Sequence, residues 1–182
     1  VLTFVLRFED QPNPADTDTE KSKVPAPSIT NERVVLSSPL AGRVVPLNEV
    51  KDQVFSSGAM GKGIAIDPAN GTLVAPADGT ITTLFPTGHA IGLTTTDGVE
   101  ILMHIGMDTV ELEGKGFEIF VKQEDQVKKG DLLVKFDLSL IKEAGYSTVT
   151  PIVVTNTPNY LDVLDMNQED VLQGEDFLAI VK

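Results

Sequence analysis

The stretch APADGTIT, residues Ala75–Thr82, repeats the pattern of SPLAGRVV, residues Ser38–Val45, with an offset of 37 residues. In both stretches a small residue precedes Pro, Gly follows three positions after the Pro, and a β-branched residue follows two positions after the Gly. Glycine permits the positive φ angles that tight turns require, and proline suits the starts and edges of strands. The repeat therefore predicts that one β-hairpin motif is used twice.

A second pair of similar segments lies further along the chain. VKKGDLL, residues Val127–Leu133, and VLQGEDF, residues Val171–Phe177, share Val, Gly and an acidic residue at the same spacing, with an offset of 44 residues. Turn-rich β sequences also produce such similarities by chance, so chance repetition is the alternative to duplication. Taken together, the two pairs favour a duplicated hairpin motif.

Apolar residues occur in short runs of Val, Ile and Leu that Gly, Pro and Asp interrupt. Short strands separated by turn residues roughly every eight to twelve positions are typical of all-β sandwiches and barrels. Long stretches with helical periodicity are missing from the sequence. We therefore predict an all-β fold, an antiparallel β-sandwich or barrel, with one or two short helical turns at DLSLIKEAG (Asp137–Gly145, with Asp137 as N-cap) and NYLDVLD (Asn159–Asp165).

The N-terminal part of the chain differs in composition from the rest. Its first residues, VLTFVLRF, are apolar but far short of the roughly 20 residues that span a bilayer. Residues 9–30 are rich in Pro, Asp, Thr and Ser without apolar periodicity, which is typical of an extended linker. The chain does not begin with Met, so we expect it to start inside a longer polypeptide. We divide it into a linker, residues 1–30, and one folded domain, residues 31–182.

Charge and composition narrow the range of functions. The chain carries 27 acidic and 14 basic residues, a formal net charge of −13, which argues against nucleic acid as a partner and favours a basic protein. It contains no cysteine, which excludes disulfides, thiolate metal sites and cysteine nucleophiles. Any covalent chemistry must therefore use another side chain, and the chain has 2 histidines.

One histidine interrupts the apolar run EILMHIGMDTVEL, residues Glu100–Leu112. Alternate side chains of a strand point to opposite faces. The apolar face, which we predict to enter the core, consists of Ile101, Met103, Ile105 and Met107. The other face is mixed and consists of Glu100, Leu102, His104, Gly106 and Asp108. His104 should therefore point away from the core, with Gly106 leaving space for a ligand or for a hydrogen bond to the backbone.

The other histidine, His89, lies in LFPTGHAIGL, residues Leu84–Leu93. Strict alternation places it with the bulkier set of side chains, although a bulge at Gly88 would reverse that assignment. The turn-like TTDG, residues 95–98, separates the two histidines, so we predict adjacent antiparallel strands, about 4.8 Å apart. If both imidazoles project from one face, they meet.

Two adjoining imidazoles suit the handling of a phosphoryl group. A neutral imidazole is a nucleophile near pH 7, because its ordinary pKa is about 6.5. A second imidazole can donate a hydrogen bond to the incoming anion, and positioned donors are the main requirement of phosphoryl transfer. The alternative for each histidine is a hydrogen-bonded packing residue.

The segments APADGTI, TGHAIGL and ILMHIGMDTVEL together resemble enzyme IIA of the glucose family of the bacterial phosphoenolpyruvate:sugar phosphotransferase system. The resemblance extends from VVLSSPLAGRVVPL, which begins at Val34, to the final GEDFLAIVK, over about 150 residues. The start of the chain also resembles the exit from a membrane-embedded IIC domain in fused permeases of the sucrose, β-glucoside or trehalose type. The resemblance implies a phosphocarrier domain tethered at the cytoplasmic side of the cell membrane, without a cofactor or a bound metal.

The resemblance also implies roles for individual residues. His104 corresponds to the residue that takes the phosphoryl group on Nε2 from HPr, the histidine-carrier protein, and passes it to a cysteine of a IIB domain. His89 corresponds to the second histidine, which contacts the phosphoryl group, and Thr87 to the hydroxyl residue that orients it. The implied partner-binding residues are the acidic Asp52 and Asp108 and an apolar rim of Phe55, Phe85, Leu102 and Val110.

Other interpretations of these residues are open. Each aspartate could be a solvated or turn residue, the phenylalanines could belong to the core, and Thr87 could be an ordinary strand hydroxyl. A zinc hydrolase would use both histidines and an aspartate, but Asp108 lies four residues from His104, about 13 Å along a continuous strand. GAMGKG, residues 58–63, lacks the spacing of a phosphate-binding loop.

A domain that only binds regulatory partners, according to its phosphorylation state, is the main non-enzymatic alternative. The sequence leaves open the transported sugar, the regulatory partners and the oligomeric state.

Overall fold

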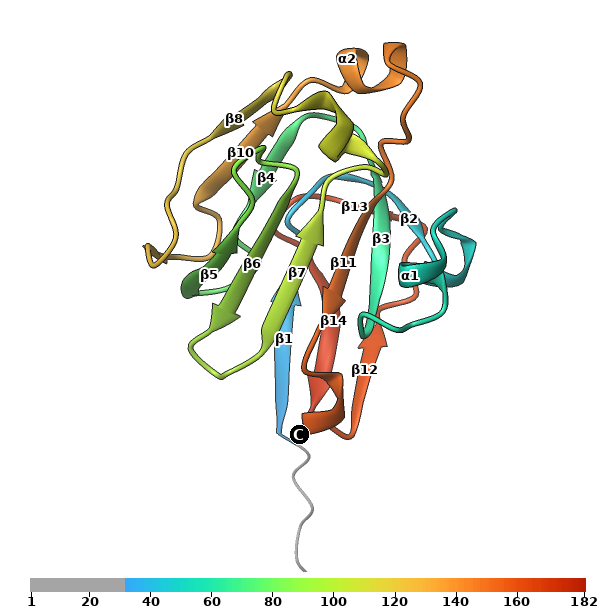
Figure 1. Cartoon of the computed structure of the whole chain (residues 1–182). Helices are drawn as coiled ribbons and strands as arrows, with labels where there is room; N and C mark the ends of the chain where they lie inside the picture. The colour runs from blue at the N-terminus through green and yellow to red at the C-terminus, as the bar shows by residue number, and fades with distance from the viewer. Residues whose placement is uncertain (1–31) are drawn as a thin grey trace, which may run out of the picture. The chain divides into compact units, whose positions relative to one another are not determined.

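The computed structural model describes residues 32–182, which form the antiparallel β fold that the sequence predicts (Figure 1). The predicted linker, residues 1–30, lies outside the described residues. The described strands are arranged in one eight-stranded sheet and two three-stranded sheets. No helix within residues 32–182 is long and apolar enough to cross a membrane.

The eight-stranded sheet has the order β13-β2-β3-β11-β7-β6-β5-β9. Its strands, in that order, are Asp170–Val171, Gly42–Val45, Lys62–Pro68, Thr150–Val154, Glu100–His104, Ala90–Thr95, Gly79–Leu84 and Gln126–Val127. The small sheets have the orders β1-β14-β12 and β4-β10-β8. Their strands, in those orders, are Arg33–Ser37, Asp176–Val181 and Asp162–Asp165, and then Thr72–Val74, Leu132–Phe136 and Phe117–Ile119.

The duplicated sequence motifs occupy matching places in the large sheet. β2 and β5, which lie in the SPLAGRVV and APADGTIT repeats, each stand second from an edge. β13 and β9, which lead into the VLQGEDF and VKKGDLL repeats, form the two edges. The sheet therefore consists of two equivalent halves on either side of the central pair β11–β7, and each half has its own small sheet.

Reciprocal backbone hydrogen bonds join the two copies of the first repeat. The N–H of Ser37 donates to the carbonyl of Pro76 at 3.0 Å. The N–H of Val74 donates to the carbonyl of Pro39, also at 3.0 Å. The prolines stand at the same position of the two repeats, so each copy forms the same contact with the other.

The turns that follow β9 and β13 are also built alike. Gly130 and Gly174 both have a φ of +89°, in the left-handed region that favours glycine. The Gly130 N–H donates to the carbonyl of Ala75 at 2.9 Å. The Gly174 N–H donates equivalently to the carbonyl of Ser38, at the same distance. Chance similarity of sequence would not produce matching bonds, so the predicted duplication of the hairpin is confirmed.

Among residues 32–182, two short α-helices lie outside the sheets. α2, Leu138–Glu143, is the helix predicted from DLSLIKEAG, and its predicted N-cap Asp137 accepts a hydrogen bond from Leu140 N–H at 3.0 Å. α1, Gln53–Ser56, was not expected from the sequence. Its signal is Asp52, an acidic N-cap whose carboxylate accepts hydrogen bonds from the first turn.

The helical prediction for NYLDVLD, Asn159–Asp165, is wrong. The 3₁₀ turn η3, Thr157–Asn159, ends where this stretch begins, and β12 occupies its second half. Val163 is buried whereas Leu164 is exposed, which is the two-residue period of a strand. Pairing of β12 with β14 stabilises the extended conformation, and no such pairing is available to a helix.

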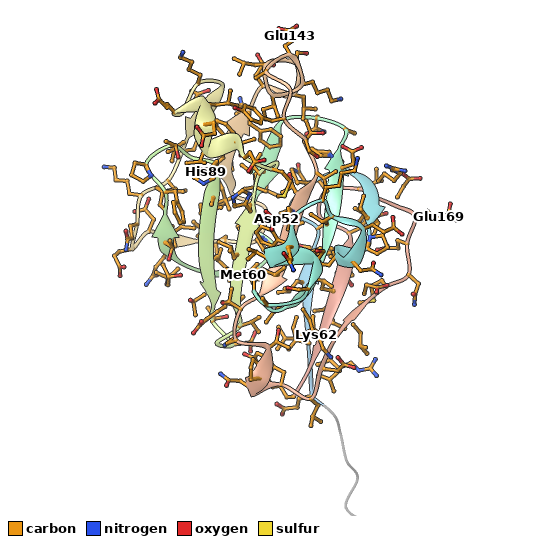
Figure 2. All side chains as sticks on the ribbon, turned by 45° about the vertical axis from the view of Figure 1, so that its right-hand side comes forward. Asp52, Met60, Lys62, His89, Glu143 and Glu169 are labelled. Atoms are coloured by element: carbon orange, nitrogen blue, oxygen red, sulfur yellow. The ribbon has the colours of Figure 1, made fainter. Side chains whose placement is uncertain are left out.

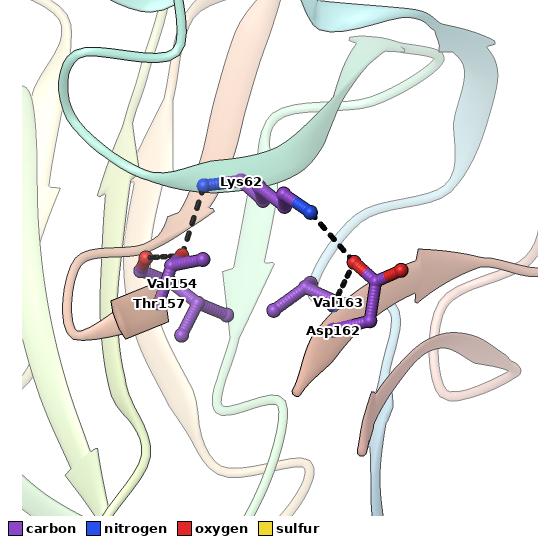
Figure 3. Close-up of polar contacts among 5 residues, drawn as sticks. All are labelled: Lys62, Val154, Thr157, Asp162 and Val163. Atoms are coloured by element: carbon purple, nitrogen blue, oxygen red, sulfur yellow. Dashed lines mark hydrogen bonds and ion pairs between the residues drawn. The ribbon is translucent and has the colours of Figure 1, made fainter. Parts of the chain in front are cut away.

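Side-chain contacts join β12 to the start of β3 (Figure 3). Lys62 Nζ pairs with the carboxylate of Asp162 at 2.7 Å, and the Lys62 N–H donates to Thr157 Oγ1 at 3.0 Å. The Thr157 hydroxyl donates in turn to the carbonyl of Val154 in β11. The ion pair is exposed and adds little stability, but the contacts together fix a small-sheet strand against the large sheet.

The inner face of the large sheet forms the main core. Ile101, Met103 and Ile105 are buried in it, as their alternation predicts. Met107 is also buried, but its predicted place on that same face is wrong, because it packs in a second cluster. Gly106 has a φ of +70° and turns the chain after β7, so the alternation stops before Met107.

The second cluster lies on the outer face of the large sheet, on the half that contains β2, β3 and β11. Its buried members are Val45, Val50, Phe55, Ala65, Met107 and Val153. Residues 46–61, which include the 3₁₀ turn η1 (Leu47–Glu49) and α1, pack on this cluster, and α1 is drawn beside β3 in Figure 1. The half that contains β7, β6 and β5 is open, since its exposed residues include Thr82, Thr83 and Glu100. One half of this face is therefore covered and the other is open.

Candidate active site

His104 and His89 come together at one end of the central strands. His104 is the last residue of β7 and pairs with Ala90, the first residue of β6. His89 immediately precedes β6, and its carbonyl accepts a hydrogen bond from Ile105 N–H at 2.7 Å. The two imidazole centroids are 5.1 Å apart, and the ring planes make an angle of 77°. The structure thus brings the two predicted histidines into contact.

His89 reaches this face because the chain turns before β6. Strict alternation would place its side chain with Ile91, which lies in the main core. Residues 86–89 instead form a turn, and Gly88 has a φ of +75°. The reversal expected from a bulge at Gly88 is therefore present, and only 4% of His89 is exposed.

The hydrogen bond of each Nδ1 atom determines how its ring can act. His104 Nδ1 lies 2.7 Å from the carbonyl oxygen of Gly106. A carbonyl only accepts, so Nδ1 carries the proton and the lone pair of His104 Nε2 is free to attack an electrophile. His89 Nδ1 lies 2.6 Å from Thr87 Oγ1. If the hydroxyl donates, the ring proton of His89 is on Nε2, where it can bind an anion.

Four aromatic rings form a row through the site. The order is Phe55, His104, His89 and Phe85, and successive ring centroids are 5.4, 5.1 and 5.2 Å apart. Phe55 is 6% exposed and Phe85 is 43% exposed. The row therefore extends from the covered part of the sheet face to the solvent, with the histidines between two apolar rings.

Apolar side chains near this row differ in their exposure. Leu102, two residues before His104 on β7, is partly buried against the second cluster. Val110 is exposed on the 3₁₀ turn η2, Thr109–Leu112. Val54, next to Phe55 in α1, is exposed.

The two predicted acidic residues flank the site differently. Asp52 accepts hydrogen bonds through Oδ1 from Val54 N–H at 2.8 Å and Phe55 N–H at 3.3 Å. In Figure 2, Asp52 lies at the start of α1, in front of the strands, and His89 lies at the upper end of β6. Asp108 is exposed and has a φ of +58°, and its side chain does not cap η2. Asp52 thus has a structural role besides its charge.

The surroundings of both imidazoles favour their neutral form. Burial lowers the pKa of His104 below its usual value of 6.5. The Gly106 carbonyl and the charges of Asp52 and Asp108 act in the opposite direction but do not outweigh burial. Burial also lowers the pKa of His89, and the neighbouring imidazole of His104 lowers it further. The neutral form is the one in which His104 Nε2 is nucleophilic.

The zinc alternative needs ligands beyond the two histidines. β7 ends at His104, so the spacing of a continuous strand does not apply to Asp108. Within residues 32–182, no group of three or more His, Cys, Asp or Glu residues is arranged to hold a metal ion. The two imidazoles supply two ligands where protein zinc sites use three or four.

The chain is similar in sequence to proteins of one known family. The family model for the phosphoenolpyruvate-dependent sugar phosphotransferase system, EIIA 1, matches residues 34–160, which include every predicted site residue. The chain is 45% identical over 170 residues to the PTS system beta-glucoside-specific EIIBCA component of Halalkalibacterium halodurans, covering 93% of this chain and 27% of that protein. It is 52% identical over 130 residues to the PTS system glucose-specific EIIA component of Bacillus cereus, covering 71% of this chain and 78% of that protein.

A solved structure resembles the fold. Glucose permease IIA from Mycoplasma capricolum matches with a TM-score of 0.73 at 39% identity, covering 82% of this chain and 96% of that chain. The chain spans about a quarter of the length of the EIIBCA relatives that it matches. The chain therefore belongs to the EIIA 1 family of the phosphoenolpyruvate-dependent sugar phosphotransferase system, and is a phosphoryl-transfer component.

Proposed function

We propose that the domain accepts a phosphoryl group from phospho-HPr on Nε2 of His104 and passes it to a cysteine of a IIB domain. In the first step a P–N bond in HPr breaks as a P–N bond to His104 forms. In the second step that bond breaks as a P–S bond forms on the IIB cysteine. The observation that carries the proposal is the free Nε2 of His104, whose Nδ1 is held by the Gly106 carbonyl beside a second imidazole.

His89 assists this transfer by binding the phosphoryl oxygens. Its ring is 5.1 Å from that of His104, within reach of a group bonded to His104 Nε2. The hydroxyl of Thr87, 2.6 Å from His89 Nδ1, orients the ring and keeps a proton on its Nε2. A donor that is in place before the phosphoryl group arrives stabilises the transferring anion without further rearrangement.

The surface around the histidines docks the two partner proteins. The apolar rim contains two exposed residues, Phe85 and Val110. Its other two residues are less exposed, because Phe55 belongs to the second cluster and Leu102 packs against it. Closing this rim against a partner removes water from the site and favours direct transfer over hydrolysis. The carboxylates of Asp52 and Asp108, and the net charge of −13, suit a basic donor surface on HPr.

The domain works as one part of a longer permease. Relatives named EIIBCA components support fusion to IIB and to a IIC membrane domain. Residues 1–30 then form the linker that follows IIC, and residues 31–182 form the phosphocarrier domain. The linker tethers the domain at the cytoplasmic side of the membrane, close to the IIB cysteine.

Phosphorylation of variants tests the assignment. The protein is incubated with phosphoenolpyruvate, enzyme I and HPr, and acid-labile phosphate is located by mass spectrometry. We expect wild type to be labelled on His104, His104→Ala to remain unlabelled, and His89→Gln to accept phosphate but to transfer it poorly to IIB. Labelling of His89 alone would overturn the assigned roles. Binding of unphosphorylated His104→Ala to its partners, measured separately, shows whether the loss is one of chemistry or of docking.

A further inference from the structure

We propose that Thr150, in β11, is a positioning residue for His104. Its hydroxyl holds the amide of Gly106, whose carbonyl binds His104 Nδ1 and so keeps the lone pair on Nε2. The consequence for phosphoryl transfer rests on the proposed function. The expected effect on the imidazole of His104 does not, because it is to be measured on the unphosphorylated protein.

The chain after β7 cannot hold its own conformation by strand pairing. Gly106 and Asp108 both have left-handed φ angles, +70° and +58°, so residues 105–109 leave the sheet. Glycine has the widest range of backbone conformations of any residue. The carbonyl that binds His104 therefore belongs to the residue with the greatest intrinsic freedom, and its orientation must be fixed by neighbouring groups.

Two contacts, one to the segment before β11 and one to the first residue of β11, fix the two peptide groups of Gly106. Met107 N–H, in the peptide that contains the Gly106 carbonyl, donates to the carbonyl of Ser147 at 3.0 Å. Gly106 N–H donates to Thr150 Oγ1 at 3.3 Å. Of these two contacts only the second is made by a side chain, so only Thr150 can be tested by a simple substitution.

The Thr150 hydroxyl is itself fully oriented. Thr150 is 0% exposed, and its hydroxyl donates to the carbonyl of Thr148 at 2.9 Å. A hydroxyl has one proton, so once this proton is donated only the lone pairs of Thr150 Oγ1 face Gly106. Thr150 Oγ1 therefore acts as the acceptor in its contact with Gly106 N–H, because its own proton is used in the hydrogen bond to Thr148.

The space around Gly106 leaves no room for a side chain. A Cβ atom on Gly106 would lie 2.5 Å from the carbonyl oxygen of Ser147 and 2.6 Å from Thr109 Cγ2. The hydroxyl of Thr109 also donates to the carbonyl of Ile105, which closes the turn from the other side. The two peptide groups of Gly106 share its Cα atom, so we expect a shift of its amide, once the Thr150 hydroxyl is lost, to displace the carbonyl that His104 uses.

The experiment compares Thr150→Val, which removes the hydroxyl at similar volume, with Thr150→Ser, which keeps it. The ¹⁵N shifts of the His104 ring are measured by NMR above its pKa. We expect the shifts of wild type and Thr150→Ser to show a protonated Nδ1 and an unprotonated Nε2. In Thr150→Val the shifts of Nδ1 and Nε2 should move toward each other, because the proton is no longer held on Nδ1. The initial rate of phosphorylation by phospho-HPr should fall roughly tenfold in Thr150→Val, the size of loss seen when a residue that orients a metal-binding histidine is replaced.

Thr148→Val is the matched control, because its hydroxyl binds Asp67 at 2.9 Å and does not contact Gly106. It should leave the His104 shifts unchanged. Unchanged shifts in a folded Thr150→Val protein, or equal changes in Thr148→Val, would overturn the proposal. If Thr150→Val does not fold, Thr150→Ala is compared with Thr150→Ser instead. Rapid hydrogen exchange of the Gly106 amide in wild type would also overturn the proposal. Failure of phosphorylation in wild type would count against the proposed function and not against these ring shifts.

Discussion

The ring of Phe55 lies 5.4 Å from the ring of His104, at the boundary between the covered and the open half of the outer sheet face. Phe55 is held there by α1, whereas His104 ends a central strand. The site therefore lies where residues 46–61, which cover one half of the outer sheet face, meet the strands of the other half, which are exposed on this face. One side of His104 is shielded by this contact, while its Nε2 stays free.

Removing the Phe55 ring should raise the pKa of His104 toward its ordinary value, because burial is the main cause of its lowering. Phe55→Ala should also lower the free energy of unfolding by about 3–5 kcal/mol, since the ring is part of the second cluster. NMR titration and urea unfolding measure the two effects. Phe85→Ala, at a more exposed ring, should cost less stability. An unchanged pKa of His104 in Phe55→Ala would contradict this account of its burial.

Asp52 combines a cap and a charge, and two substitutions separate these roles. Asp52→Asn keeps an oxygen that can accept from Val54 and Phe55, so stability should change little. The pKa of His104 should nevertheless fall further, because the negative charge that raises it is gone. Asp52→Ala should lower the same pKa and also cost about 1 kcal/mol of stability through the lost cap. Equal stability of the two variants would argue against the capping role.

The hydroxyl of Thr87 should affect transfer of the phosphoryl group from His104 to IIB more than it affects phosphorylation of His104. Thr87→Val removes the partner of His89 Nδ1, so the ring loses its fixed tautomer. We expect phosphorylation of His104 to persist and transfer to IIB to slow roughly tenfold. Single-turnover transfer from the isolated phosphoprotein measures the second step alone. Thr96→Val, in the exposed turn between β6 and β7, is the control and should transfer normally.

Stability should fall in mildly acidic solution because of the two histidines. Folding lowers the pKa of both rings, mainly through burial, so the unfolded chain binds protons more tightly than the folded one. Their contribution is complete above the unfolded value of about 6.5 and is lost as pH falls through the lowered values. Urea unfolding across this range should show a shallower pH dependence in the double variant His89→Gln, His104→Gln. Identical slopes in the two proteins would be the contrary result.

The internal duplication predicts matched effects in the two repeated turns. Gly130 and Gly174 have the same φ, and a Cβ added to either meets no atom within 4 Å. Each Gly→Ala substitution should therefore cost about 1–2 kcal/mol from backbone strain alone. Gly79→Ala should cost more, because its Cβ would lie 2.3 Å from the carbonyl oxygen of Thr94. Thermal unfolding of the three variants compares them, and unequal losses at Gly130 and Gly174 would show that the turns differ.

Much of the fold was predictable because it depends on local patterns. The paired Pro and Gly positions indicated the duplicated hairpin, and Asp137 indicated the start of α2. Alternation placed Ile101, Met103 and Ile105 in the core correctly. The helix predicted for Asn159–Asp165 is wrong, because pairing of β12 with β14 outweighs a weak local preference for helix. Residue roles carried over from the family resemblance stay predictions until the variants are measured.

The sequence by itself determined the strand pattern, the two histidines and the family, since these follow from residue types and their spacing. Only the tertiary structure decided which way His89 points, because Gly88 reverses the chain and interrupts the alternation. It also decided that Met107 packs on the outer face and that Phe55 shields His104. The physical reason is that a strand fixes the direction of its side chains by periodicity, whereas a turn or a covering segment takes its orientation from the groups that it packs against.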